Sequence, residues 1–127
     1  MKEYITLTVD EKSVKVEKGS TLLEAARKAG ADIPTLCHDE RVKPYGACGM
    51  CVVECKGSPK LMRSCAIEAA DGMEIITESD RINRARRFSL EMLLSDHTGD
   101  CKAPCSLACP AGTDCQGYVG LIANGEN

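Results

Sequence analysis

The chain has 127 residues and a formal net charge of -3, from 16 lysines and arginines against 19 aspartates and glutamates. This length suits one ordinary domain with an extension, and the lack of a net positive charge argues against a nucleic-acid partner. There is no tryptophan and only one phenylalanine, which also argues against a surface on which bases stack.

The first eighty residues predict several short strands and one helix. The runs YITLTVD and SVKVE are β-type, and the letters DEK between them can close a hairpin. Ser20 or Thr21 can begin a helix, with Glu24 completing a capping box after Thr21 and Gly30 ending the helix. Further strands are expected in CVVEC, LMRSCAIEA and MEIITE.

A longer helix is expected from residue 80, with Asp80 as its N-cap. Apolar side chains recur there at roughly helical spacing; they are Ile82, Ala85, Phe88, Leu90, Met92 and Leu93. The start of the chain lacks the apolar run of a signal peptide, and no later stretch approaches the ~20 apolar residues of a membrane span. We therefore expect a cytoplasmic, reducing location and no membrane span.

The nine cysteines are the most informative residues of the sequence. An odd number of thiols without an export signal argues against a disulfide framework and favours metal binding. The cysteines form a middle group and a later group. The middle group is Cys37, Cys48, Cys51, Cys55 and Cys65, and the later group is Cys101, Cys105, Cys109 and Cys115.

Four cysteines of the middle group stand in the pattern Cys-x10-Cys-x2-Cys-x13-Cys; they are Cys37, Cys48, Cys51 and Cys65. Four thiolates suit either zinc or an iron-sulfur cluster. A zinc ribbon usually has two short Cys-x2-Cys knuckles, and only one pair here has that spacing, so a [2Fe-2S] cluster is favoured. Gly46 and Gly49 would let backbone amides approach the anionic sulfurs, and we count them as cofactor-binding residues.

The segment CHDERVKPYGACGMCVVEC, followed by RSC, resembles a known family. It is similar to the N-terminal [2Fe-2S] ferredoxin domain of the NADH-quinone oxidoreductase large subunit, iron-only hydrogenases and NAD-dependent formate dehydrogenases. The resemblance implies an α+β, β-grasp ferredoxin-like domain over residues 1–79, with the four cysteines as ligands of a cluster that passes single electrons. Cys55 lies outside the ligand spacing and is interpreted as a packing residue.

Residues 80–127 are expected to form a helical, cysteine-rich extension. The segment from Ser95 resembles the start of the iron-sulfur domain of the glutamate synthase small subunit and dihydropyrimidine dehydrogenase. That resemblance implies [4Fe-4S] ligands, with His97, Cys101 and Cys105 serving one cluster and Cys109 another. The remaining ligands would come from a downstream segment or a partner, and Cys115 is either a ligand or a core residue.

Other polar residues predict less specific roles. His38 is expected to face solvent, and the arginine-rich run RINRARR to be a solvated helix face rather than a docking surface. No catalytic triad, carboxylate pair or nucleotide-binding loop is found, so catalysis by this chain alone is not expected.

Three functions remain open. The preferred one is an electron-transfer module of a larger oxidoreductase, such as a glutamate synthase-like, hydrogenase or formate dehydrogenase complex. Its partners would be a redox protein or downstream flavin or NAD(P) domains. The alternatives are a structural zinc-binding adaptor and an iron-sulfur redox sensor.

Overall fold

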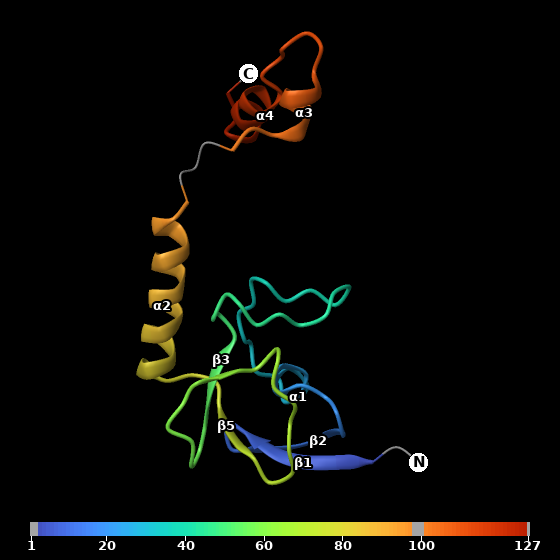
Figure 1. The fold of residues 1–127 in the computed structure, drawn as a ribbon, viewed down its shortest axis with the longest axis vertical. Coiled ribbons are helices and arrows are strands. Elements are labelled where there is room, and N and C mark those ends of the chain that lie inside the picture. Colours follow the sequence, from blue (N-terminus) through green and yellow to red (C-terminus); the bar gives the residue numbers. More distant parts are fainter. Residues whose placement is uncertain (1–2, 98–100, 127) are drawn as a thin grey trace. The chain divides into compact units, whose positions relative to one another are not determined.

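In the computed structural model the described residues are 3–97 and 101–126. They divide into two compact units, Met1–Ser95 and Asp96–Asn127, each of which is treated by itself (Figure 1). The first unit contains β1 (Tyr4–Val9), β2 (Lys12–Glu17), α1 (Leu22–Lys28), β3 (Val52–Cys55), β4 (Met62–Arg63), β5 (Glu74–Ile76) and α2 (Asp80–Ser95). The second contains α3 (Pro104–Ala108) and α4 (Cys115–Ala123).

The five strands form one mixed sheet in the order β2-β1-β5-β3-β4. β1 pairs with β5 in parallel, whereas the β1–β2, β3–β5 and β3–β4 pairs are antiparallel. A sheet of this kind with helices is an α+β fold, consistent with the expected β-grasp ferredoxin-like architecture. The expected fold class is thus confirmed.

The β1–β2 hairpin closes through a two-residue turn, with Val9 opposite Lys12. Asp10 and Glu11 both have positive φ, 45° and 67°, as the tight turn of a twisted hairpin requires. Aspartate tolerates this conformation better than most residues. The Asp10 carboxylate also accepts two hydrogen bonds from Thr77, one from its backbone N–H at 2.8 Å and one from its hydroxyl. The turn is therefore tied to the segment that follows β5.

Helix α1 begins with the capping box that the sequence predicted. The backbone N–H of Glu24 donates to Thr21 Oγ1 at 3.2 Å, and the backbone N–H of Thr21 donates to Glu24 Oε2 at 2.7 Å. Gly30, with φ of 87°, follows the C-cap residue Ala29. The apolar face of the helix is buried in the core.

Replacing Thr21 by alanine should lower the free energy of unfolding by about 1 kcal/mol, because one end of the capping box is lost. Urea unfolding followed by circular dichroism measures the change. Ser20→Ala is the matched control, since Ser20 accepts from the N–H of Ala69 through its carbonyl oxygen rather than its hydroxyl. Equal effects of the two substitutions would contradict a capping role for Thr21.

The core of the first unit lies between the sheet and α1 and is built from aliphatic side chains. It includes Leu7, Val9, Leu22, Leu23, Ile33, Val53 and Ile75. Two of the cysteines singled out by their spacing, Cys51 and Cys65, belong to the same buried cluster. The proposed metal site is therefore continuous with the core.

Helix α2 differs from expectation at its start and along its surface. Ser79, not Asp80, is the capping residue, because its Oγ accepts from the N–H of Ile82 at 3.1 Å. The Ser79 hydroxyl also donates to Glu54 Oε1 on β3, at 2.6 Å, which holds it in the capping position. Of the apolar residues expected to pack, Ile82 alone is buried, and Phe88 is 63% exposed.

None of the helices in residues 3–97 and 101–126 is long and apolar enough to cross a membrane. The expected division of the chain at residue 79 remains a prediction, and the compact first unit continues to Ser95. Residues 98–100 and 127 of the expected extension lie outside the described residues.

Candidate metal centre

The segment between α1 and β3 contains no helix or strand among its described residues (Figure 1). It carries three of the four spaced cysteines, namely Cys37, Cys48 and Cys51. Gly46 and Gly49 have φ of 66° and 73°, a left-handed conformation that side-chain-bearing residues rarely adopt. Cys48 stands between them, and Cys51 immediately precedes β3. The two glycines therefore shape the turns that carry these cysteines.

The fourth cysteine comes from the segment that follows β4. Cys65 follows β4, which pairs with β3. Cys51 and Cys65 are only 2% and 1% exposed, whereas Cys37 and Cys48 are half-buried. Two thiols thus face the core and two lie closer to the surface.

Ser64 ties the buried cysteines together, although nothing in its sequence context predicted such a role. It is fully buried, and its hydroxyl donates to the carbonyl oxygen of Cys51 at 2.7 Å. Its backbone N–H donates to the same oxygen at 3.2 Å. The only sequence signal was a small polar residue directly before Cys65, which does not distinguish a buried anchor from a turn residue.

The pKa values of two thiols report that all four interact. Burial, hydrogen bonding with Cys51 and the charge of the other three thiols raise the pKa of Cys65 to about 12. Burial opposes ionisation of Cys48, yet its pKa is lowered because backbone N–H groups and the thiol of Cys37 donate to its sulfur. The pKa of Cys65 thus depends on the other three spaced cysteines, and the pKa of Cys48 depends on Cys37.

Backbone N–H groups lie close to the sulfur of Cys48. The N–H of Met50 donates to Cys48 Sγ at 3.5 Å, and the N–H groups of Leu36 and Cys37 also donate to this sulfur. Such donors stabilise anionic sulfur, which a buried site needs. Amide donors of this kind are what the glycines of the loop were expected to supply.

Both glycines also lie where an added Cβ would be crowded. A Cβ on Gly49 would approach Ser89 Oγ of α2 to 2.6 Å, and a Cβ on Gly46 would approach Ala66 Cβ to 3.1 Å. The loop thus packs closely on residues beside Cys65 and on α2. Four neighbouring thiols, amide donors and a tightly packed loop fit a [2Fe-2S] cluster, which thiolates bind and N–H donors stabilise.

Within residues 3–97 and 101–126, no three His, Cys, Asp or Glu side chains have the geometry to hold one metal ion. A [2Fe-2S] cluster differs from such a site, because it divides four thiolates between two irons. Cys55 lies at the end of β3, and its thiol donates to the carbonyl oxygen of Lys56 at 3.6 Å.

His38 was expected to face solvent, but its side chain is half-buried. Its Nδ1 is shielded from solvent and has no hydrogen-bond partner among the described residues.

The second unit gathers three of the later cysteines. Partial burial and the neighbouring Cys105 raise the pKa of Cys115, which also shares a hydrogen bond with Cys109. Hydrogen bonds from Thr113 and from nearby backbone N–H groups lower the pKa of Cys109. Neither His97 nor Cys101 takes part in these contacts among the described residues. The expected set of His97, Cys101, Cys105 and Cys109 therefore stays a prediction.

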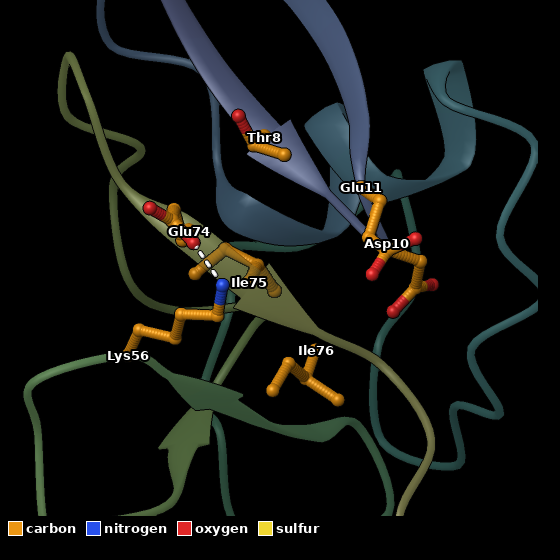
Figure 2. A pocket seen from close by; sticks show the side chains of 7 residues that line it. All are labelled: Thr8, Asp10, Glu11, Lys56, Glu74, Ile75 and Ile76. Carbon is orange, nitrogen blue, oxygen red and sulfur yellow. Dashed lines mark ion pairs between the residues drawn. The ribbon is translucent and has the colours of Figure 1, made fainter.

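A separate cavity of about 380 Å³ lies beside the β1–β2 turn, and none of its lining residues is a cysteine. Figure 2 shows the Lys56 ammonium directed at the Glu74 carboxylate, with which it forms an ion pair. The Asp10 carboxylate is already engaged by Thr77. The polar groups of this cavity thus serve the fold.

Comparison with known proteins gives one match by family and several by sequence. The family model of the 2Fe-2S iron-sulfur cluster binding domain matches residues 2–80. An NADH-quinone oxidoreductase subunit from Rhizobium meliloti (strain 1021) is 42% identical over 112 residues, which are 88% of this chain and 12% of that protein. The alpha subunit of NADPH-Fe(3+) oxidoreductase from Geobacter sulfurreducens is 38% identical over 111 residues, 87% of this chain and 13% of that protein.

A solved structure is also similar. The crystal structure of an NAD+-reducing [NiFe]-hydrogenase in the H2-reduced state superposes with a TM-score of 0.68 at 35% identity. The match covers 97% of this chain and 50% of the hydrogenase chain. The chain thus spans half of that structure and a much smaller share of the two curated relatives.

Proposed function

This chain belongs to the family of 2Fe-2S iron-sulfur cluster binding domains, and from that membership we propose that it relays single electrons within a larger oxidoreductase. The ligands are Cys37, Cys48, Cys51 and Cys65. The observation that carries the assignment is the placement of these thiols in the first unit: Cys51 and Cys65 lie together in the buried core, and the Met50 N–H donates to the sulfur of half-buried Cys48. All four fall inside the span of the family match.

The bound [2Fe-2S] cluster supplies a centre that accepts and donates one electron. The chain's own residues bind it and limit its exposure. Cys51 and Cys65 would hold the cluster from the core, and half-buried Cys37 and Cys48 would hold it from nearer the surface. Amide N–H groups around Cys48 offset the negative charge of the thiolates, and Ser64 fixes the spacing of the two buried ligands.

The names of the relatives support electron transfer over the zinc-adaptor and redox-sensor alternatives. Both curated relatives described above are oxidoreductase subunits, and the similar solved structure is a hydrogenase. By this analogy the partners of the chain are flavin or NAD(P) domains or a redox protein. A cytoplasmic location completes the proposal, since free thiols and a thiolate-bound cluster suit a reducing compartment.

The second unit belongs to the proposal as a carrier of [4Fe-4S] ligands completed by a downstream segment or partner. The grouping of Cys105, Cys109 and Cys115 supports a thiol-rich site there. None of the relatives described above is a glutamate synthase, so that resemblance remains a prediction. The partition into residues 1–79 and 80–127 remains one as well.

The proposed relay should have a low midpoint potential, nearer ~-400 mV than the range of centres with histidine ligands, because four thiolates favour the oxidised cluster. An EPR-monitored redox titration of the reconstituted chain measures it. Reduction by a low-potential flavoprotein, followed by reoxidation on adding a higher-potential acceptor, tests the relay itself. A midpoint above zero would rule out the low-potential relay.

A further inference from the structure

Helix α2 presents one side to the loop that carries Cys48 and Cys51. Ile82, Arg86 and Ser89 are spaced by four and three residues, so they share one face of the helix. Ile82 is completely buried, Arg86 and Ser89 are half-buried, and α2 contacts β3. Figure 1 shows α2 beside β3. This helix continues beyond residue 80, at which the family match ends.

Arg86 joins this face to the backbone beside a proposed ligand. Its Nη2 donates to the carbonyl oxygen of Val52 at 3.0 Å and to that of Thr77 at 3.2 Å. Val52 directly follows Cys51, so the first contact fixes the chain immediately after that ligand. The arginines of the run RINRARR were expected to form a solvated helix face. Arg86 differs from this expectation, because its side chain is partly buried.

The Arg86 guanidinium lies in partly buried surroundings, within reach of the charges of Glu78 and Cys51. Burial lowers its pKa, while the charges of Glu78 and Cys51 act in the opposite direction. Its Nε is inaccessible to solvent and has no hydrogen-bond partner among the described residues. Arginine keeps its proton in proteins, and a charge in partly buried surroundings is screened less than an exposed one.

Ser89 shows that the contact between helix and loop is close. A Cβ added to Gly49 would meet Ser89 Oγ at 2.6 Å. The helix therefore covers the loop next to Cys48, while Arg86 holds the strand next to Cys51. By contrast, Arg84 on the same helix is exposed.

We propose that Arg86 is a positioning residue for the [2Fe-2S] centre, holding a fixed positive charge beside Cys51 and thereby raising the reduction potential of the cluster. Reduction adds one negative charge to the cluster, so a nearby cation stabilises the reduced form more than the oxidised form. The guanidinium acts from α2, outside the matched family span. The inference rests on the proposed function, because it requires Cys51 to be a ligand.

The test compares reduction midpoints of the full reconstituted chain and its variants by EPR-monitored titration. Arg86→Gln should shift the midpoint to more negative values. Arg86→Met keeps an apolar stem without the charge and should shift it in the same direction. Arg86→Lys keeps the charge and should stay closer to the unmodified chain, even if its weaker anchoring lowers the unfolding midpoint. Arg84→Gln removes an exposed charge and should leave the potential nearly unchanged.

Loss of the cluster in the glutamine and methionine variants, with retention in the lysine variant, would also support the proposal. Unchanged midpoints in Arg86→Gln and Arg86→Met would overturn it, as would cluster loss in all three Arg86 variants with Arg84→Gln intact. Failure of the proposed function would look different, because the unmodified chain would then have no reducible [2Fe-2S] centre at all.

Discussion

Replacing any one of Cys37, Cys48, Cys51 or Cys65 by serine should remove most of the [2Fe-2S] centre, whereas Cys55→Ser should retain it. Loss of a thiolate leaves an iron site without its preferred ligand. The effect should exceed the 10–100-fold loss of affinity typical of outer-shell residues of metal sites. Visible absorption after anaerobic reconstitution and the EPR signal of the reduced state measure the retained cluster.

The buried and half-buried ligands need separate controls. Serine at Cys51 or Cys65 places a hydroxyl in the core, which costs about 1–3 kcal/mol if the hydroxyl is unpaired. Urea unfolding of the cluster-free variants separates this cost from lost ligation. The half-buried Cys37 and Cys48 should show the loss of cluster with little change in stability. Bleaching by Cys55→Ser, with an intact cluster in Cys65→Ser, would show that the ligand assignment is wrong.

Gly49→Ala should destabilise the chain and impair cluster incorporation together. The left-handed backbone conformation alone costs a residue with a Cβ roughly 1–2 kcal/mol. The new Cβ would in addition press against Ser89 Oγ, 2.6 Å away. Relief of that contact requires the Ser89 side chain to rotate or the loop beside Cys48 to move from α2. Urea unfolding and iron content per chain after reconstitution measure the two effects.

Gly57→Ala is the matched control, because Gly57 has a φ of 84° and its added Cβ would meet nothing within 4 Å. It should show the backbone cost without loss of iron. The double variant Gly49→Ala, Ser89→Ala should recover the part of the effect due to the side-chain contact. Equal losses of stability in Gly49→Ala and Gly57→Ala, with iron content unaffected in both, would mean that the loop does not rest on α2 as described.

The local features of the fold could be predicted because they depend on nearby residues. The Thr21–Glu24 capping box and the β1–β2 turn each lie within a few positions of the sequence. The cap of α2 was assigned to the wrong neighbour, since Ser79 and Asp80 are both good capping residues. The structure favours Ser79 because Glu54, far away in sequence, holds its hydroxyl.

The cysteines of the candidate site could be predicted from the sequence, but the residues that hold them in place could not. The spacing of the cysteines and the glycines between them indicated a metal site, because few residue types can bind a given metal. Ser64 and Arg86 are common surface residue types, and their roles appear only when distant segments meet. The apolar spacing of α2 likewise predicted a packed face, although Phe88 is largely exposed in the first unit.

The central claim is that Cys37, Cys48, Cys51 and Cys65 together bind a [2Fe-2S] cluster. It is tested most directly by metal and sulfide analysis of the anaerobically prepared chain, combined with EPR before and after reduction. We expect about two irons and two sulfides in this site, with no signal from the oxidised cluster and a [2Fe-2S] signal on reduction that Cys65→Ser abolishes. A colourless chain containing zinc, or a [2Fe-2S] signal that persists unchanged in Cys65→Ser, would contradict the claim.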